Sequence, residues 1–252
     1  MTSRKLWIIG PLSFLALWGL TSASKFVDPL FLPAPWDVAR SLASLFLTER
    51  DIYAPAWSSL RRMLFGFVLG VGTGVPFGIL LGSSPKLYAT FEVLVDFLRS
   101  VPSTAFLPLF MLLFGVGDGP KVAVVVFGCF FVCVINTAAG VVHASPARLF
   151  VAQLMHASRF YTFSRVRLFE ALPSIAAGIR ISISYAVVLV VVSEMFIGTD
   201  VGLGRLIFDS HFTFKTARMY AVIAVAGGIG FLANKGFALA ERRVLHWSGK
   251  ST

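Results

Sequence analysis

The segment ASPARLFVAQLMHASRFYTFSRVRLFEALPSIAAGIR, Ala144 to Arg180, decides the fold, because it is a long polar interruption between two apolar runs. It is compatible with helix and carries five arginines and His156, against a single carboxylate, Glu170. A segment with this charge cannot lie in hydrocarbon. It must therefore project into water or onto a partner, while the apolar runs on either side of it cross a membrane.

The composition independently indicates an integral membrane protein. Hydrophobic residues make up 57% of the 252 residues and charged residues only 13%, and the mean hydropathy is +0.82. About a quarter of the residues of a soluble protein are charged. The net charge of +10 could suggest a nucleic-acid partner, but the basic residues cluster in loops and tails between the apolar runs. This pattern indicates membrane topology, so nucleic acid is excluded as a partner.

The apolar runs predict an all-α polytopic membrane protein. Acidic residues gather in the segments expected on the outer side, and arginines and lysines gather on the inner side, which places both termini in the cytoplasm. We expect one transmembrane domain over residues 1–252, with about six spans at approximately 6–24, 58–82, 91–114, 121–142, 174–197 and 217–240.

The first apolar stretch has two interpretations. Arg4 and Lys5 precede it and Thr21 to Ser24 follow it, as in a cleaved secretory signal. Its length and its tryptophans also suit an uncleaved spanning helix, which we favour. The amphipathic piece from Trp36 to Leu47 is expected to lie along the outer interface, since its apolar residues recur at helical spacing.

The second span carries glycines at every fourth position: Gly66, Gly70, Gly74, Gly78 and Gly82. Such a ridge lets another helix approach closely, which favours helix association in lipid. We interpret it as a packing face. Arg61 and Arg62 lie at the outer end of this span.

The third span places Asp96 and Arg99 three residues apart, so that they can pair on one helix face, and Pro102 follows. The pair is either an internal ion pair at the membrane edge or part of a gate in which Pro102 kinks the helix. In the fourth span, Asn136 is expected to hydrogen-bond a neighbouring helix, with a pore-lining role as the alternative.

Glu194 lies close to the outer end of the fifth apolar run, where a carboxylate is costly unless it faces water or a partner. Its role is either a structural ion pair or hydrogen bond to the next loop, or a contact with the solute. Cys129 and Cys133 are four residues apart inside an apolar run and are interpreted as small core residues. None of the four histidines has a partner at metal-ligand spacing, and no catalytic set is suggested, so we do not expect an enzyme.

An ordered set of residues resembles the EAA loop of the permease subunits of bacterial ATP-binding-cassette (ABC) importers. The set is Ala152, the string HASR from His156 to Arg159, LFEALP from Leu168 to Pro173, and GIR from Gly178 to Arg180. The likeness covers most of the chain, Asp28 to Arg243, and is greatest to the branch that carries sulfonates, taurine and nitrate. The chain departs from the family pattern where Phe150 replaces an acid, His156 a glycine and Phe169 a proline.

The resemblance implies a type I importer permease fold in which residues 144–173 form a cytoplasmic coupling helix that docks on an ATPase. The residues expected to couple to the ATPase are Phe150, Ala152, His156, Ala157, Ser158, Arg159, Glu170 and Pro173. Those expected in the translocation pathway or its gate are Asp96, Arg99, Pro102, Asn136 and Glu194.

The resemblance also implies the partners and the location in the bacterial inner membrane. The expected partners are two cytoplasmic ATPase subunits, a second permease copy or a homologous permease, a periplasmic or lipid-anchored substrate-binding protein, and membrane lipid. The chain contains no GxxxxGK[ST] phosphate loop, so ATP and magnesium would be bound by the separate ATPase and no cofactor by this chain. The expected cargo is a sulfonate, taurine, nitrate or a similar small anion.

Two alternatives remain at this stage. The altered EAA loop is compatible with a degenerate half of a heterodimeric permease. A secondary transporter or channel is the other alternative, although neither inverted repeats nor an ionisable relay at the membrane midplane is visible.

Overall fold

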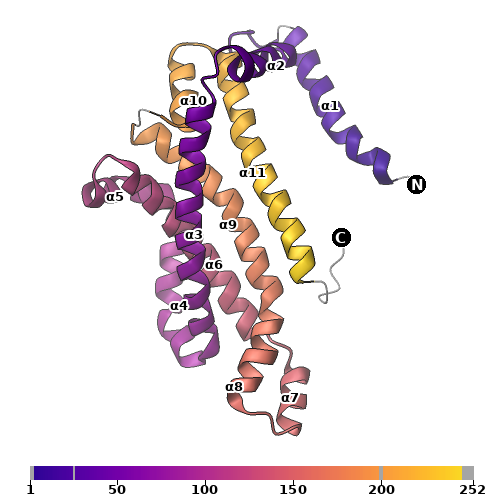
Figure 1. The fold of residues 1–252 in the computed structure, drawn as a ribbon, viewed down its shortest axis with the longest axis vertical. Coiled ribbons are helices and arrows are strands. Elements are labelled where there is room, and N and C mark those ends of the chain that lie inside the picture. Colours follow the sequence, from indigo (N-terminus) through magenta and orange to yellow (C-terminus); the bar gives the residue numbers. More distant parts are fainter. Residues whose placement is uncertain (1–2, 25, 199–200, 246–252) are drawn as a thin grey trace.

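The computed structural model describes residues 3–24, 26–198 and 201–245, and all regular structure within them is helical (Figure 1). The helices are α1 (Ser3–Ala23), α2 (Pro35–Ala43), η1 (Ser44–Thr48), α3 (Tyr53–Ser83), α4 (Pro85–Ser100), η2 (Ser103–Phe106), α5 (Leu107–Phe114), α6 (Asp118–Val142), α7 (Pro146–Leu154), α8 (Arg159–Tyr161), η3 (Thr162–Arg167), α9 (Leu168–Phe196), α10 (Leu203–Phe212) and α11 (Thr216–Val244).

The core of the bundle is α6, which packs against α3 on one side and α9 on the other. The predicted glycine ridge of α3 is the contact face with α6. A Cβ placed at Gly70 would lie 2.7 Å from the Cβ of Cys129, and one at Gly78 would lie 2.7 Å from the Cβ of Thr137. A Cβ on Gly72, off the ridge, would meet nothing within 4 Å. The interpretation of the ridge as a packing face is confirmed.

The contact between α6 and α9 also depends on small residues. Gly178 of α9 lies directly against Asn136 of α6. Cys129 and Cys133 are buried, and the sulfur of Cys133 lies 3.3 Å from the hydroxyl of Ser182 on α9. The two cysteines are therefore core residues, as predicted. Three helices held at such short separation form a tightly packed unit, since close packing leaves little room for sliding.

Four helices among the described residues are long and apolar enough to cross a membrane: α3, α6, the run Arg159–Phe196 that contains α9, and α11. The helices α4 and α5 pass the same criteria only together, as a pair bent by 87°. The segment expected to span at 91–114, where Pro102 was expected to kink the helix, is therefore sharply bent. The reason is Pro102, which holds the preceding Val101 in an extended conformation and ends α4.

The N-terminal part lies beside the bundle. The apolar stretch Ile8–Ala23 of α1 is a shorter helix than the four long ones, and most of its large side chains are exposed. Its anchors are Trp18, whose indole donates to the carbonyl of Pro33 at 3.0 Å, and Ser22, whose hydroxyl donates to that of Leu32. The ring of Trp18 also lies against Tyr220 of α11.

Helix α2 and the adjoining η1 cover the end of the bundle that is remote from α7 and α8, which we call the outer end (Figure 1). Val38 of α2 and Leu45 of η1 are buried in a cluster with α10 and α11, so the amphipathic piece packs on protein with its apolar face. Arg218 of α11 pairs with Glu49 and Asp51 and fixes the segment after η1. The outer loop expected after the fifth span contains α10, a helix that was not predicted.

Candidate functional site

The predicted coupling segment projects from the inner end of the bundle, where it joins α6 to α9 (Figure 1). Ser158 caps α8 by accepting a hydrogen bond from the backbone N–H of Tyr161 at 3.2 Å. Ala152 is buried, and its carbonyl accepts the N–H of Ala157 at 3.0 Å, which closes the turn after α7. His156 in this turn adopts a left-handed conformation, with φ of 49°. The family pattern has a glycine at this position. His156 therefore stands where a left-handed backbone favours glycine.

The tip of the segment is both apolar and basic, although it lies outside the bundle. We define the coupling face as its exposed side chains: Phe150, Val151, Leu154, Met155, Arg159, Phe160 and Tyr161. Phe160 is 81% exposed and Met155 76%. Exposed apolar side chains clustered at the end of a bundle, with arginines among them, are characteristic of a protein interface.

Glu170 and Pro173 belong to the root of this segment and do not lie on the coupling face. The Glu170 carboxylate accepts the backbone N–H of Ser145 ahead of α7 and pairs with Arg148 at 3.0 Å. Pro173 lies inside α9. Glu170 therefore ties the start of α7 to the first turn of α9, so that the segment is held to both spans that it connects.

Asp96 and Arg99 form the predicted ion pair on one face of α4, at 2.8 Å. Both side chains are about half exposed and line a cavity of about 170 Å³ against α6, together with Tyr88 and Glu92. Charged side chains within a spanning segment require water or a protein partner, because hydrocarbon cannot solvate them. Pro102 lies at the bend that follows α4. The pathway assignment of these residues remains a prediction.

Asn136 differs from its prediction. Its amide donates to the carbonyl of Val132 in its own helix at 2.8 Å, and the side chain packs on Gly178 of α9. The hydrogen bond to a neighbouring helix that the sequence suggested is not the one formed. The glycine brings α9 so close that the amide remains against its own helix.

Glu194 is completely buried in a polar network at the outer end of the bundle. Its carboxylate accepts hydrogen bonds from Arg62 Nη1 at 2.7 Å, from Ser59 Oγ at 2.7 and 2.8 Å, and from the N–H of Gly204 at 2.9 Å. Arg62 Nε also donates to Asp118 at 2.7 Å. This geometry agrees with the structural ion pair rather than the solute contact that the sequence left open.

Sequence reasoning missed the partners of Glu194, because they lie far away along the chain. Arg62 and Ser59 come from α3, and Asp118 is the first residue of α6. The signal that could have found them is two adjacent arginines at the outer end of an apolar span, which require buried or nearby acids. The Gly-Leu-Gly turn at 202–204 was a second signal, since a Cβ at Gly202 would lie 2.5 Å from the Glu194 carboxyl carbon.

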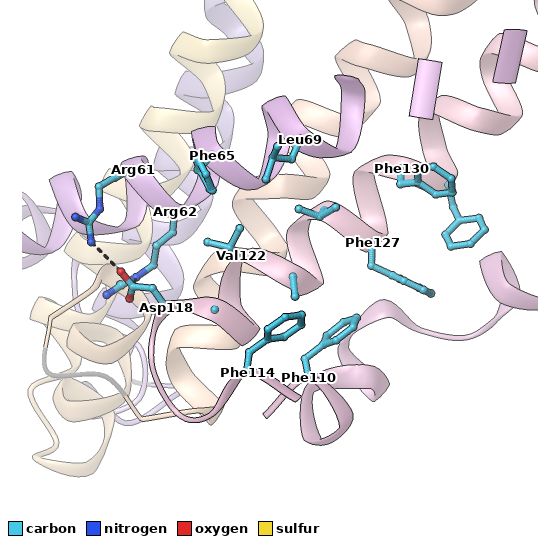
Figure 2. Close-up of a pocket in the computed structure, with 14 residues that line it drawn as sticks. Arg61, Arg62, Phe65, Leu69, Phe110, Phe114, Asp118, Val122, Phe127 and Phe130 are labelled. Carbon is cyan, nitrogen blue, oxygen red and sulfur yellow. Dashed lines mark hydrogen bonds and ion pairs between the residues drawn. The ribbon is translucent and has the colours of Figure 1, made fainter. Parts of the chain in front are cut away.

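An apolar groove of about 810 Å³ lies between α3, α5 and α6, beside this network (Figure 2). Figure 2 shows Arg61 and Arg62 both meeting Asp118 at one end of the groove. The rest of its lining is largely aromatic and aliphatic: Phe65, Leu69, Phe110, Phe114, Val122, Phe127 and Phe130. The groove thus separates α5 from α3.

Comparison with known proteins supports the class of protein that the sequence predicts, a permease subunit of an ABC importer. Residues 74–246 match the family described as "Binding-protein-dependent transport system inner membrane component". A Bacillus subtilis protein named for aliphatic sulfonate transport, the permease SsuC, is 32% identical over 96% of this chain and 88% of its own. The taurine transport system permease protein TauC of Escherichia coli is 30% identical over 96% of this chain and 90% of its own.

A solved structure shares the fold. Inward-facing MetNI, a methionine ABC transporter, contains a chain that matches with a TM-score of 0.66 at 19% identity, covering 87% of this chain and 99% of that one. The bundle with a projecting segment between α6 and α9 is thus the type I permease fold. By its family match and its two relatives, the protein belongs to the binding-protein-dependent inner membrane components, as a multi-pass permease subunit of an ABC importer of the sulfonate, taurine and nitrate type.

Proposed function

We propose that two copies of this chain, or this chain and a homologous permease, form a translocation pathway that two separate ATPase subunits drive through the coupling face. The single observation that carries the proposal is the coupling face itself. Apolar side chains such as Phe160 and Met155 are exposed at the inner end of the bundle. From the distribution of arginines and acids in the sequence, we infer that both termini lie in the cytoplasm. ATP and magnesium are bound by the ATPase, and this chain contributes no catalytic residue.

The cargo we propose is a small organic sulfonate, delivered by a periplasmic or lipid-anchored binding protein. The support is the pair of relatives named for aliphatic sulfonates and for taurine, each aligned over 96% of this chain. In the pathway, the charged pair of Asp96 and Arg99 faces the water-filled space between the permeases. This placement satisfies both side chains without exposing them to hydrocarbon.

Transport follows alternating access. Closure of the ATPases on ATP draws the two coupling segments together, and α6 and α9, which the segment connects, turn the pathway outward. Hydrolysis resets it. The coupling face must contact the two ATPase states differently, since only a difference in binding free energy shifts the populations of two conformations.

The experiment that tests the proposal is co-purification with the ATPase encoded beside this chain, followed by uptake and ATP hydrolysis in liposomes. The variants are Phe160→Asp together with Met155→Asp, two exposed positions where the change does not disturb packing. We expect loss of the ATPase from the purified complex, because two desolvated carboxylates oppose an apolar contact. Phe26→Asp is the matched control, because Phe26 is 89% exposed and follows α1 at the other end of the bundle.

The binding protein that stimulates hydrolysis identifies the cargo, and stimulation only by a nitrate- or bicarbonate-loaded protein would rule out the sulfonate assignment. A double-aspartate chain that assembles and transports like wild type would show that this segment does not couple. A wild-type chain that is active only when a second, different permease is present would favour the degenerate half of a heterodimer.

A further inference from the structure

We propose that Arg62 and Glu194 are positioning residues that lock the outer ends of α3, α6 and α9 and the start of α10 into one rigid body. Through this lock, a displacement of α9 at the coupling segment reaches the outer mouth of the pathway. The inference rests on the proposed function, because it concerns how the ATPase-driven motion is transmitted. Neither residue contacts the cargo in this scheme.

The lock consists of hydrogen bonds from two side chains of α3, Arg62 and Ser59. The guanidinium of Arg62 joins three separate segments: it donates to Asp118 at the start of α6, to Glu194 on α9 and to the carbonyl of Val201 at 2.9 Å. Ser59 closes the network, because its hydroxyl donates to Glu194 while it accepts the N–H of Leu203 at 2.9 Å. One side chain of α3 therefore fixes the outer ends of α6 and α9, and another fixes the start of α10.

The lock cannot open during transport without a large penalty. Glu194 has no exposed surface and the side chain of Arg62 is only 7% exposed. Separating them would leave the buried carboxylate of Glu194 without its counter-charge, which is strongly unfavourable away from water. The glycine turn encloses the acid closely, since a Cβ at Gly202 would lie 2.5 Å from the carboxyl carbon of Glu194 and one at Gly204 would lie 2.7 Å from its Cβ. The pair is thus built to persist through the cycle.

The neighbouring α5 lacks such a lock. Its described contacts with the core are apolar: Leu107 is buried in the core cluster with Met63 and Val124, and the ring of Phe110 lies 6.0 Å from that of Phe127. The adjoining η2 adds a hydroxyl contact between Ser103 and Tyr185 at 3.3 Å. The groove of about 810 Å³ separates it from α3. Apolar burial is non-directional, so these contacts can re-form after a shift more easily than an ion pair can. The movement at the outer mouth is therefore expected between α5 and the locked body.

The test measures two distances in the assembled transporter. Spin labels are placed at Trp57 on α3 and Phe212 on α10, both exposed, and in a second sample at Trp57 and Leu112 on α5. Each assembly contains one doubly labelled copy of the chain. Between the resting complex and the complex trapped with ATP and vanadate, the first distance should stay unchanged and the second should shift. A shift of the first distance would overturn the proposal in the wild-type chain, without any mutant.

Two variants then test the residues. Glu194→Gln keeps the shape of the side chain and removes the ion pair. Arg62→Lys keeps the charge, but a single ammonium cannot reproduce the planar fork that serves three acceptors. Both should broaden the Trp57 to Phe212 distance distribution and reduce uptake, with the greater loss of uptake for Glu194→Gln. Co-purification of the ATPase and ATP hydrolysis should remain, since the coupling face is unchanged. Asp37→Asn, which removes an exposed pair with Arg40, is the control.

Failure of the lock and failure of the proposed function give different results. If the wild-type chain does not bind an ATPase, the proposed function is wrong. If wild type transports and both variants transport equally well with narrow distance distributions, the lock is wrong. A variant that is lost during purification leaves the decision to the two wild-type distances.

Discussion

Single glycines decide whether a carboxylate can be buried at the outer end of α9. Glu194 is enclosed by Gly202 and Gly204, whose missing side chains leave space for the carboxyl group and let a backbone N–H reach it. Without that N–H, a fully buried charge would keep fewer hydrogen bonds, and its burial would become unfavourable. The turn and the acid therefore form one structural unit.

A matched pair of glycine substitutions tests this unit. A Cβ at Gly204 would lie 2.1 Å from the carbonyl oxygen of Val191, so Gly204→Ala should destabilise the purified protein by about 1–3 kcal/mol or more. Gly227→Ala in α11 meets nothing within 4 Å and should be neutral or stabilising by up to about 1 kcal/mol. Thermal unfolding in detergent measures both. Equal effects of the two changes would contradict the packing argument.

His156 supplies a second prediction at the residue scale. With φ of 49°, it occupies a conformation that costs a residue with a side chain about 1–2 kcal/mol. His156→Gly should therefore keep or raise stability, by at most about 1 kcal/mol because glycine also loses more entropy on folding. His156→Ile should lower it by about 1 kcal/mol or more, since β-branched residues avoid this region.

The readout for His156 is unfolding temperature together with ATPase binding. A stable His156→Gly chain that binds the ATPase at least as well as wild type agrees with a turn that only shapes the coupling segment. Weaker binding at unchanged stability would instead assign the imidazole a direct contact with the ATPase.

Pairs of residues were predictable when they were close in sequence. Asp96 and Arg99 were predicted to pair because residues three apart share a helix face, and they do so at 2.8 Å. The pair of Arg62 and Glu194 joins residues 132 positions apart. Its partners depend on how α3 and α9 pack, and a single sequence contains no direct record of that packing. Glu194 was noticed as a carboxylate that needs water or a partner, whereas Arg62 was noted only for its place at the outer end of its span.

At the scale of elements, α3 packs against α6 through its glycine ridge, in which a glycine recurs at every fourth position. Gly70→Leu and Gly72→Leu make the same change two residues apart on one helix. The first would force a side chain against Cys129 and Val126, and the second meets nothing within 4 Å. We expect Gly70→Leu to cost at least about 3 kcal/mol and to abolish a monodisperse preparation, whereas Gly72→Leu stays close to wild type.

Size-exclusion profiles of the two detergent-solubilised variants, at equal expression, measure this difference. A monodisperse Gly70→Leu protein would mean that α3 and α6 separate easily. This result would contradict the proposal that α3, α6 and α9 move as one rigid body.

Elements were predictable where hydrophobicity alone sets their extent. The spans expected at 58–82 and 121–142 correspond to α3 at Tyr53–Ser83 and α6 at Asp118–Val142. The segment expected to span at 91–114 is bent by 87°, an angle that hydrophobicity alone does not show. The helix α10 was missed for a related reason, because its apolar side is covered by α11 and α2 rather than by lipid.

At the scale of the whole molecule, the sequence predicts the family and the orientation from different signals. The ordered residues of the coupling segment predict the family, which the comparison with known proteins confirms. The orientation follows from the distribution of arginines and acids. The structure adds that the two ends of the bundle are chemically different, with a basic, apolar coupling face at one end and the buried Glu194 network near the other.

The orientation makes a prediction for intact cells. Single cysteines at Phe26, at the end that carries α2, and at Phe160, in the coupling segment, are 89% and 81% exposed as the native side chains. A membrane-impermeant maleimide should label Phe26→Cys in intact cells and Phe160→Cys only after permeabilisation. The native Cys129 and Cys133 should stay unlabelled in both conditions, because they are buried between α3 and α9.

The same preparations decide whether the first apolar stretch is retained. Trp18 and Ser22 donate to carbonyls of Pro33 and Leu32, so α1 has specific contacts with the rest of the chain that a discarded signal would not need. The intact mass of the purified chain should therefore include residues 1–24. A mass that corresponds to a chain starting after Ser24 would identify the stretch as a cleaved signal and leave the new N-terminus on the outer side. Labelling of Phe160→Cys in intact cells, at any mass, would invert the orientation and place the coupling face where no cytoplasmic ATPase can reach it.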